Sequence, residues 1–420
     1  MSRVHRCVYS GLVRVGLPIA FGRLLWRSRR EAAYRRRWHE RLGLPRGLPT
    51  GGVWLHAVSV GEVNAAAPLI EALLARYPQL PLTVTTITPT GSAQLRRRFD
   101  RRVTHCYLPY DTPGAVRRFF DRLQPCVGVI METELWPNLL FTATARNIPV
   151  ILANARLSER SARGYRRWSA LTAQTLSQLA HAGAQTATDA TRLRTLGLAA
   201  ARVTVTGNIK FDAQRADPAS GVALRQRLGQ DRPVWLAAST HAGEEDAVLR
   251  AHTALRERHP TAALILAPRH PQRFDEVAQL CQKQGWATRR RSTDDHADCT
   301  VYLADTLGEL PGLMAAADVV FVGGSLAPVG GHNLIEPAQQ SKPILFGPHM
   351  HNFWELRSQV LTAGAGAEVM DADALATQLH TLISTASARD RMGRAASVLV
   401  SQHRGATART LALLTPYLPG

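Results

Sequence analysis

The sequence predicts two doubly wound α/β domains of similar size. Short apolar runs alternate with amphipathic segments, and each run ends in a polar or glycine-containing loop. This alternation is typical of βαβ units, in which helices cover both faces of a parallel sheet. The pattern stops at a polar stretch, residues 212–221, and then restarts. A chain of 420 residues suits two domains of about 150–200 residues each.

The apolar runs of the first half predict a sheet. Strands are expected at Val53–Val58, Leu82–Thr86, Cys126–Met131 and Pro149–Ala153, with helices at Asn64–Arg76, Gly114–Leu123 and Ser161–Leu179. Residues 1–30 are expected to form a membrane-anchor segment and residues 31–212 the first Rossmann-like domain, which would bind the acceptor.

The second half repeats the pattern. Strands are expected at Val234–Ala238, Ala263–Ala267, Thr300–Leu303, Val319–Val322 and Pro343–Phe346, with helices at Glu244–Arg258 and Arg273–Gln284. Residues 213–420 are expected to form the second domain. Because ligands of such sheets bind beyond the carboxyl ends of the strands, a shared ligand is expected in a cleft between two facing domains.

Basic residues are concentrated at the N-terminus. The net charge is +19, and residues 1–46 contribute +10 of it with twelve Arg and two Glu. Such a chain is drawn to polyanions such as nucleic acid, anionic lipid or a phosphorylated substrate. A nucleic-acid binder usually spreads its charge along a groove, whereas here the excess borders an apolar run. The distribution favours a lipid surface.

The apolar run, residues 7–26, is interrupted by Arg14 and Arg23. A central arginine is costly in a spanning helix, and no small-residue cleavage site follows as in a secretory signal. An interfacial helix fits better, with Trp26, Trp38 and the arginines of residues 27–37 among anionic headgroups. A single span and a buried or solvated helix remain alternatives. The flanking positive charge predicts that the body of the protein is cytoplasmic.

Cysteine usage predicts a reducing compartment. The five cysteines, Cys7, Cys106, Cys126, Cys281 and Cys299, are odd in number and contain no CxxC pair. This pattern argues against a disulfide framework and against a structural zinc site.

Two motifs of the first half carry carboxylates at strand ends. In HAVSVGEVNAAAPLI (56–70), Ser59 and Gly61 allow a tight turn that places Glu62 near a helix N-terminus. The helix dipole alone also favours a glutamate there. In METELWPN (131–138), Glu132 and Glu134 point to one side if the strand continues. A buried acidic pair is costly without a function, although helix capping is an alternative explanation.

A lysine lies at the expected domain boundary. In TGNIKFD (206–212), Lys210 could meet negative charge that develops on a phosphate or carboxylate leaving group. A solvated linker lysine is the alternative.

The most specific motif is GGSLAPVGGHNLIEPA, residues 323–338, after the apolar run 319–322. Backbone N–H groups in a glycine-rich loop at a helix N-terminus form an anion site. Asn333 and Glu336 are three residues apart and would share one helix face, where a carboxylate can accept bonds from ribose hydroxyls. The alternative is a simple glycine turn.

Further polar residues follow other strands of the second half. Thr240 and His241 follow one strand, Arg269 and His270 follow another, and Gly308–Leu310 precede the glycine loop. The second domain is therefore predicted to bind a nucleotide. The chain has no GxxxxGK[ST] loop, no GxGxxG after an early strand, no HExxH and no DxD. ATP hydrolysis, dinucleotide binding and a metal-bridged pyrophosphate are not indicated.

Taken together, these motifs resemble the 3-deoxy-D-manno-octulosonic acid (Kdo) transferases of lipopolysaccharide synthesis. The resemblance runs from about Tyr34 to the C-terminus. It includes RLG near Arg41, HAVSVGEV, TPTGS, YLPYD, METELWPN, NARLSERS, TGNIKFD, APRHPQRF, GGSLAPVGGHNLIEPA and GPHMHNF. The interruption of the apolar segment by Arg14 and Arg23 departs from the family pattern and leaves the mode of anchoring open.

The resemblance implies a B-type glycosyltransferase fold, an inverting reaction and no metal or cofactor. It implies CMP-Kdo as donor, a tetraacylated disaccharide lipid A precursor as acceptor, and a place at the cytoplasmic face of the inner membrane. It implies that Glu62 is the catalytic base and that Glu132 and Lys210 stabilise the transition state. The residues implied to hold CMP are Pro268, Arg269, Gly308, Glu309, Leu310, Asn333, Leu334, Ile335 and Glu336.

Two other functions share some of these features. A nucleotide-sugar epimerase or hydrolase of the same architecture would need no lipid acceptor, which would leave the basic apolar N-terminus without a purpose. A membrane-attached nucleic-acid binder would need basic and aromatic residues interleaved on one surface. Aromatic residues make up only 6% of the chain and are not so arranged, so nucleic acid is not an expected partner.

Overall fold

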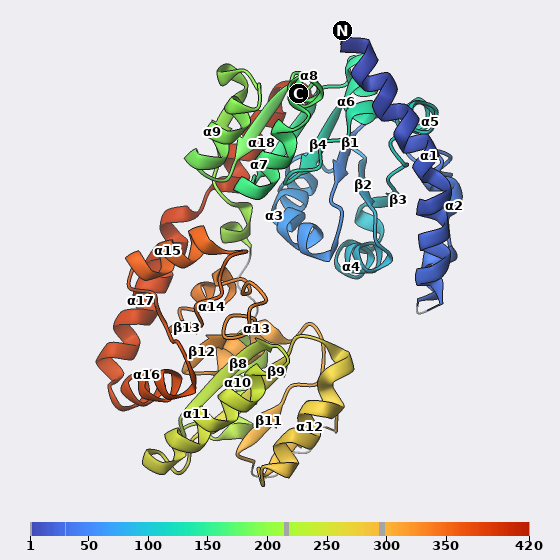
Figure 1. Cartoon of the computed structure of the whole chain (residues 1–420). Coiled ribbons are helices and arrows are strands. Elements are labelled where there is room, and N and C mark those ends of the chain that lie inside the picture. The colour runs from blue at the N-terminus through green and yellow to red at the C-terminus, as the bar shows by residue number, and fades with distance from the viewer. Residues whose placement is uncertain (1, 30, 214–217, 294–298, 420) are drawn as a thin grey trace. The chain divides into compact units, whose positions relative to one another are not determined.

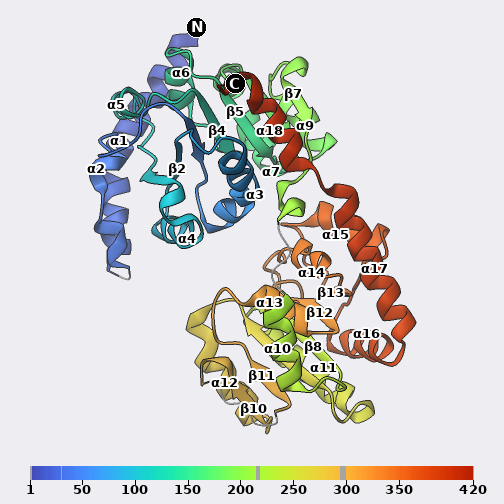
Figure 2. The same cartoon turned by 180° about the vertical axis from the view of Figure 1, so that it is seen from behind.

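The computed structural model describes residues 2–29, 31–213, 218–293 and 299–419. The chain forms two compact units, Met1–Ala213 with His403–Gly420 and Gln214–Gln402 (Figures 1 and 2). Each unit has a seven-stranded parallel sheet with helices packed on it. The predicted fold class of two doubly wound α/β domains is confirmed.

The sheet of the first unit has the order β3-β2-β1-β4-β5-β6-β7. Its strands are β1 (Val53–His56), β2 (Leu82–Thr86), β3 (Thr104–Tyr107), β4 (Val127–Met131), β5 (Val150–Ala155), β6 (His181–Ala184) and β7 (Val203–Val205). The central strands are buried apolar runs, as expected of a sheet covered on both faces. The short strands β3, β6 and β7 lack such runs, and the sequence did not predict them.

The helices of the first unit are α1 (Ser2–Ser28), α2 (Trp38–Arg41), α3 (Val60–Arg76), α4 (Pro89–Phe99), α5 (Pro113–Leu123), α6 (Pro137–Thr144), α7 (Glu159–Arg166), α8 (Ser169–Leu176), α9 (Ala187–Thr195) and α18 (Ala406–Leu414). Helix α3 begins four residues earlier than predicted, so Glu62 lies in its first turn. The single helix predicted at Ser161–Leu179 is two helices, because the backbone of Trp168 leaves the helical region.

The sheet of the second unit has the order β10-β11-β9-β8-β12-β13-β14. Its strands are β8 (Val234–Thr240), β9 (Ala263–Pro268), β10 (Thr288–Arg290), β11 (Val301–Leu303), β12 (Val319–Val322), β13 (Ile344–Phe346) and β14 (Gly366–Glu368). Its helices are α10 (Pro218–Leu228), α11 (Glu244–Arg258), α12 (Phe274–Lys283), α13 (Leu310–Ala316), α14 (Ile335–Gln339), α15 (Trp354–Thr362), α16 (Ala372–Ser384) and α17 (Ala386–His403).

The C-terminal segment belongs to the first unit, which differs from the predicted second domain of residues 213–420. Helix α18 packs on α3 and over β5 and β6, and its residues Ala406, Leu411 and Leu414 join the core of the first sheet. Burial of these apolar side chains holds the segment there. Of the predicted polar boundary, residues 214–217 lie outside the described residues.

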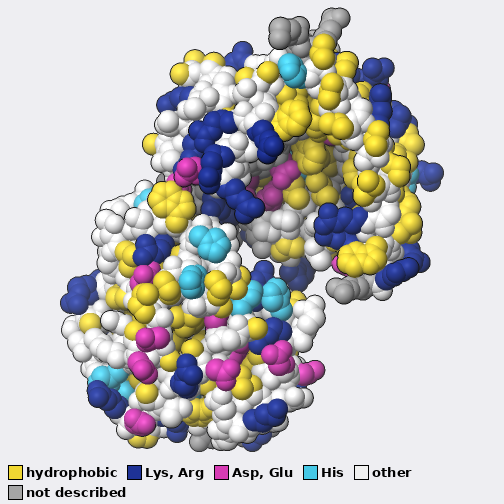
Figure 3. Space-filling model, viewed as in Figure 1, with side chains coloured by type: hydrophobic (Ala, Val, Ile, Leu, Met, Phe, Trp, Pro, Cys, Tyr) yellow, Lys and Arg dark blue, Asp and Glu magenta, His cyan; other side chains and the backbone are white. Residues whose placement is uncertain are grey.

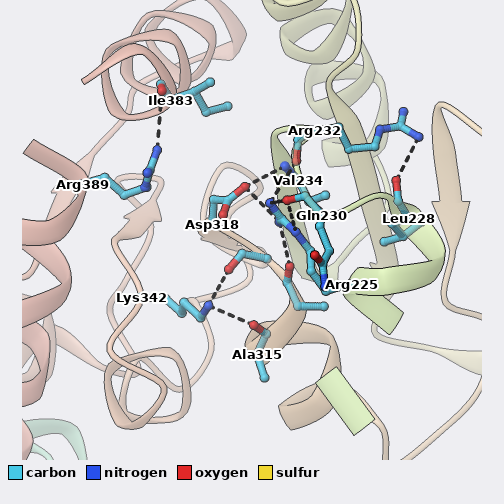
Figure 4. Close-up of polar contacts among 12 residues, drawn as sticks. Arg225, Leu228, Gln230, Arg232, Val234, Ala315, Asp318, Lys342, Ile383 and Arg389 are labelled. Carbon is cyan, nitrogen blue, oxygen red and sulfur yellow. Dashed lines mark hydrogen bonds and ion pairs between the residues drawn. The ribbon is translucent and has the colours of Figure 1, made fainter. Parts of the chain in front are cut away.

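Charged side chains form hydrogen bonds and an ion pair at the edge of the second sheet where the strands begin (Figure 4). Arg225 donates to the carboxylate of Asp318 at 3.0 Å, and the same oxygen accepts the N–H of Val234 at 2.8 Å. The ammonium of Lys342 donates to the carbonyls of Ala315 and Ala317 at 2.9 and 2.6 Å. A cavity of about 380 Å³, lined by Asp318 and Lys342 among others, lies at this edge. The residues predicted to bind nucleotide follow the opposite, carboxyl ends of the strands.

Candidate active site and nucleotide site

The predicted carboxylates of the first unit lie at the carboxyl ends of two neighbouring strands. Glu62 follows β1 and Glu132 follows β4, and these strands pair in parallel register. The strand order reverses at this pair, because β2 and β3 continue on one side and β5 to β7 on the other. In open α/β sheets this reversal leaves a crevice in which ligands bind. The topology therefore brings Glu62 and Glu132 to the expected ligand position.

Glu132 has an unusual backbone conformation. Its φ angle is +57°, in the left-handed region that residues other than glycine seldom adopt. Strand β4 ends at Met131, and the N–H of Glu132 donates to the carbonyl of Ala153 at 2.9 Å. The strand does not continue, so the alternation used to predict the directions of Glu132 and Glu134 does not apply. Conformational strain of this kind concentrates at functional sites, where the surrounding structure holds it.

Lys210 reaches Glu132 because the segment after β7 turns back across the sheet. The N–H of Thr206 donates to the carbonyl of Ala184, at the end of β6. The N–H of Ile209 then donates to the side-chain oxygen of Asn154 at 3.0 Å. Asn154 is a buried residue of β5. Lys210 lies in the 3₁₀ turn Ile209–Asp212, and its ammonium donates to Glu132 Oε1 at 3.0 Å. Lys210 is thus part of the strand-end site, not a solvated linker residue.

The turn that carries Lys210 is supported by the C-terminal segment. The carboxylate of Asp212 accepts the N–H groups of Gly405 and Thr407 at 2.7 and 2.5 Å, at the start of α18. The rings of Phe211 and His403 stack, with centroids 4.8 Å apart. Residues nearly two hundred positions apart therefore hold the turn in place.

Burial changes the acidity of Glu62. Burial, together with the charges of Glu132 and Glu134, raises the pKa of Glu62 to about 8. The N–H of Val58, which donates to Glu62 Oε2 at 2.7 Å, and the charge of Lys210 oppose this shift. Burial also raises the pKa of Glu134. A carboxylate with a raised pKa is a stronger proton acceptor once it is ionised.

A basic helix adjoins this site. Arg160, Arg163, Arg166 and Arg167 are exposed on or next to α7. The hydroxyl of Thr133 donates to the carbonyl of Arg156, and the hydroxyl of Tyr165 donates to the carbonyl of Thr133. These bonds join α7 to the loop that carries Glu132 and Glu134. Figure 3 shows acidic side chains within a hollow of this unit, with Lys and Arg on one rim and hydrophobic side chains on the other.

The predicted nucleotide residues of the second unit also follow strands at the carboxyl edge. His241 follows β8, exposed Arg269 and His270 follow β9, and His332 follows β12. The Nε2 atoms of His241 and His332 are 2.9 Å apart, and the ring of His270 meets that of His241 edge-on. Strand order reverses between β8 and β12, so this cluster lies at the switch point of the second sheet.

Burial favours the neutral form of two imidazoles in this cluster, His241 and His332. Burial, together with repulsion by His241 and Arg269, lowers the pKa of His332 to about 4. Burial also lowers the pKa of His241. Arg269 brings a guanidinium to the cluster, and its charge disfavours protonation of both imidazoles.

The other residues predicted to bind the nucleotide differ in the exposure of their side chains. Asn333 precedes α14, so it does not share a helix face with Glu336 as the sequence predicts. The two side chains are joined instead by a bond of 3.2 Å from Asn333 Nδ2 to Glu336 Oε1. Leu334, Ile335 and Pro268 are buried, so their side chains are not exposed to a ligand.

The Gly308–Leu310 stretch forms a turn before α13. Gly308 has a φ of +88°, and Glu309 is paired with Arg291 at 2.9 Å. This ion pair fixes Glu309 at the end of the loop after β11.

The glycine loop does not form the open anion site that the sequence predicts. Its amides at Gly324, Ser325, Leu326 and Ala327 donate to the carboxylate of Glu244, at 2.6–3.2 Å. Glu244 is buried and also accepts the N–H of His241 at 2.9 Å. A carboxylate from α11 therefore occupies the position predicted for a phosphate. The helix that follows, α14, begins at Ile335 and has only five residues.

Sequence reasoning did not identify the residues that hold the site together. Asn154 and Asp111 lie inside the motifs NARLSERS and YLPYD, but neither was assigned a role. Glu244 begins a predicted helix, and the sequence indicates no further role for it. Its partners lie about eighty residues away, so no local pattern could indicate the role.

Comparisons with known proteins agree with the two-unit fold and with the motifs. Residues 36–213 match the family described as 3-deoxy-D-manno-octulosonic-acid transferase (kdotransferase). A 3-deoxy-D-manno-octulosonic acid transferase of Haemophilus influenzae is 40% identical over 98% of this chain and 99% of its own. One from Bordetella pertussis is 41% identical over 87% of each chain.

Solved structures share the fold at low sequence identity. A UDP-GlcNAc 2-epimerase of Neisseria meningitidis superposes with a TM-score of 0.60 and 15% identity, over 87% of this chain and 99% of its own. At this identity the likeness concerns the fold alone.

Replacing Glu244 by alanine should loosen the glycine loop. The amides of residues 324–327 would lose their acceptor, and each buried unsatisfied group costs about 1–3 kcal/mol. Hydrogen exchange of these amides, followed by mass spectrometry, should accelerate at least about tenfold. Glu257→Ala, at an exposed position of the same helix, is the control. Unchanged protection in Glu244→Ala would show that the loop does not depend on this carboxylate.

Proposed function

Since the chain belongs to the 3-deoxy-D-manno-octulosonic acid transferase family, a family of glycosyltransferases, we propose that it moves Kdo from CMP-Kdo to the tetraacyldisaccharide lipid A precursor. One observation carries the proposal most strongly: Glu62, Glu132 and Lys210 converge at the switch point of the first sheet. An acceptor hydroxyl near neutral pH is a poor nucleophile and needs a base at such a position.

In this mechanism Glu62 accepts the proton of the acceptor hydroxyl. The hydroxyl oxygen forms a bond to the anomeric carbon of Kdo while the bond from that carbon to the CMP phosphate oxygen breaks. CMP leaves with the electron pair, and direct displacement inverts the anomeric configuration. The ammonium of Lys210 is oriented by Glu132 at 3.0 Å. Its positive charge stabilises the negative charge of the reacting sugar and phosphate. The reaction is proposed to need no metal.

The second unit is proposed to hold the CMP part of the donor. Arg269 provides the positive charge for the phosphate, and the Asn333–Glu336 pair presents a carboxylate suited to ribose hydroxyls. The amides of residues 324–327 are not assigned to the phosphate, because Glu244 accepts their hydrogen bonds. Side chains therefore take over the phosphate contact that the sequence assigned to the loop.

The basic face of α7 is proposed to meet the phosphates of the acceptor. Its exposed arginines carry charge of the required sign, and the helix is bonded to the loop of Glu132 and Glu134 through Thr133 and Tyr165. Phosphate binding at α7 would place the acceptor beside Glu62. An epimerase or hydrolase would need neither this helix nor a membrane helix, and product formation without added lipid would favour one of those activities.

Helix α1 is proposed to bind the cytoplasmic face of the inner membrane. Val4–Ser28 is long and apolar enough to cross a membrane by length and composition alone. However, α1 contacts the first unit at both ends: Tyr9 bonds Asp111 at 2.9 Å, and the ring of Phe21 lies 5.1 Å from that of Trp38. A helix that keeps both contacts lies along the domain. This favours an in-plane anchor over a span.

The exposed face of α1 is an apolar stripe. It consists of Val4, Val8, Leu12, Val15 and Ile19, spaced three or four residues apart and 52–76% exposed. Arg6, Arg14 and Arg23 are exposed on the same helix. Hydrophobic side chains gather on this flank of the unit in Figure 3, where Figure 1 shows α1. Apolar residues with neighbouring cations suit an interface of acyl chains and anionic headgroups.

Glu62→Gln should abolish most turnover and leave CMP binding intact. Glutamine cannot accept the proton, and loss of a general base typically costs 10²- to 10⁴-fold in rate. Turnover is measured with CMP-Kdo and lipid A precursor, and CMP binding by calorimetry. Glu71→Gln, on the same helix and paired with Arg102 at the surface, is the control and should be fully active. Near-wild-type turnover of Glu62→Gln would refute the role of Glu62.

The rate should depend on the ionisation of Glu62. Because burial raises its pKa to about 8, the base is mostly protonated below that pH. We expect kcat/KM to rise with pH and to level off above about 8. Glu134→Gln removes a like charge, lowers the pKa of Glu62 and should move the rising limb to lower pH. A rate that is constant from pH 6 to 9 would contradict this assignment.

Polar substitutions in the apolar stripe should weaken membrane binding. The double variant Val15→Asn/Ile19→Asn loses two of the most exposed apolar side chains of α1. Each contributes on the order of 1–2 kcal/mol on burial, so partitioning onto anionic vesicles should fall at least about tenfold in a sedimentation assay. Val398→Asn, at an exposed position of α17, should sediment like the wild type. Equal sedimentation of the double variant would overturn the anchoring proposal.

A further inference from the structure

The inner face of α1 is bonded to the helix that follows the Glu132–Glu134 loop. The hydroxyl of Tyr9 donates to Asp111 Oδ2 at 2.9 Å, and that of Ser10 donates to Asn138 Oδ1 at 3.0 Å. The guanidinium of Arg6 lies over the ring of Phe141, 4.9 Å from its centroid. Asn138 and Phe141 belong to α6, which begins three residues after Glu134. One face of α1 is therefore in contact with the structure behind the candidate active site.

Asp111 links the two helices. It is 4% exposed, and its carboxylate accepts the N–H groups of Asn138 and Leu139 at 3.0 and 2.7 Å. Asn138 Nδ2 donates in return to the carbonyl of Asp111 at 2.7 Å. These bonds satisfy the first turn of α6, whose amides have no partner within the helix. The start of α6, and with it the end of the Glu132–Glu134 loop, is set by Asp111.

The carboxylate of Asp111 depends on its donors. Burial raises its pKa to about 6, while the two amides and the hydroxyl of Tyr9 hold that shift down. Tyr9 is the donor that comes from α1. Without its hydroxyl, a buried carboxylate keeps only the two amides of α6 and is bound less firmly between the helices.

We propose that Tyr9 and Asp111 are positioning residues for the transfer reaction, so that α1 supports turnover as well as membrane binding. Through Asp111 they hold the first turn of α6 and the preceding loop in the conformation that aligns Glu132 with Lys210. This inference rests on the proposed function, because it assigns that loop to catalysis. The inference also goes beyond the proposed function, because a helix that served only as an anchor would affect only access to the lipid.

The two faces of α1 allow the two roles to be separated. Tyr9 and Ser10 face the protein, whereas the apolar stripe faces outward. An acceptor dispersed in detergent micelles removes the need for a membrane, so a change in its turnover reports on positioning. Vesicle sedimentation reports on the stripe.

The test is Tyr9→Phe in the full-length protein, which removes the hydroxyl and keeps the ring. With micellar acceptor we expect kcat to fall about three- to tenfold, since small misplacement of catalytic groups is costly. The KM for CMP-Kdo and the sedimentation with anionic vesicles should not change. Hydrogen exchange of residues 132–139 should accelerate. Tyr77→Phe removes the hydroxyl of a half-buried tyrosine in the same unit and should leave all four measurements unchanged.

The outcomes distinguish this inference from the proposed function. If the wild type does not transfer Kdo, the proposed function itself is wrong. If the wild type is active and Tyr9→Phe has an unchanged kcat, the positioning role is wrong while the function stands. A variant that loses vesicle binding, or whose KM rises at constant kcat, would likewise overturn the positioning role. Asp111→Asn, which weakens the acceptor of both amides, should lower kcat further than Tyr9→Phe.

Discussion

The ion pair between Lys210 and Glu132 joins the last segment of the first unit to the centre of its sheet. Its formation requires two unusual features. The chain after edge strand β7 must run back over the ends of β6 and β5, and Glu132 must adopt a left-handed backbone conformation. The hydrogen bond from Ile209 to Asn154 holds the returning segment in place. The end of β4 at Met131 permits the left-handed conformation of Glu132. The pair brings together two of the three residues of the candidate active site.

Both units place polar residues at the switch point of a parallel sheet, but they use different chemistry there. The first collects carboxylates and a lysine, and burial makes Glu62 a stronger base. The second collects imidazoles and Arg269, and burial keeps His332 neutral near pH 7. The same topology therefore presents carboxylates and a lysine in one unit and imidazoles and an arginine in the other. This division suits the proposed reaction, in which the acceptor needs a base and the donor carries a phosphate.

Buried or half-buried carboxylates recur as structural links between distant segments. Glu244 accepts hydrogen bonds from the amides of the glycine loop. Asp111 accepts them from the first turn of α6, and Asp212 accepts them from the start of α18. In each case the charge is stabilised by several backbone donors, which offsets its desolvation. Each link fixes a segment next to a candidate functional residue. Glu244 positions the backbone of His241, Asp111 the loop of Glu132, and Asp212 the turn of Lys210.

The fold class and the strand-end positions of Glu62, Glu132 and Arg269 could be predicted from the sequence. Apolar runs of four to six residues and the glycine-rich loops after them are local patterns. Parallel topology then requires that their ends meet at one edge. The motif resemblance added the family and the proposed role of Glu62, which local physics left as one alternative among two.

Only the tertiary structure decided which groups meet. The C-terminal helix belongs to the first unit. The carboxylate of Glu244 binds the loop that was predicted to hold a phosphate. Lys210, which the sequence places at a domain boundary, forms an ion pair with Glu132. The structure also shows that α1 lies along its domain and not apart from it. Most of these contacts join residues about eighty to two hundred positions apart. Their formation depends on packing and chain direction, which no local sequence pattern encodes.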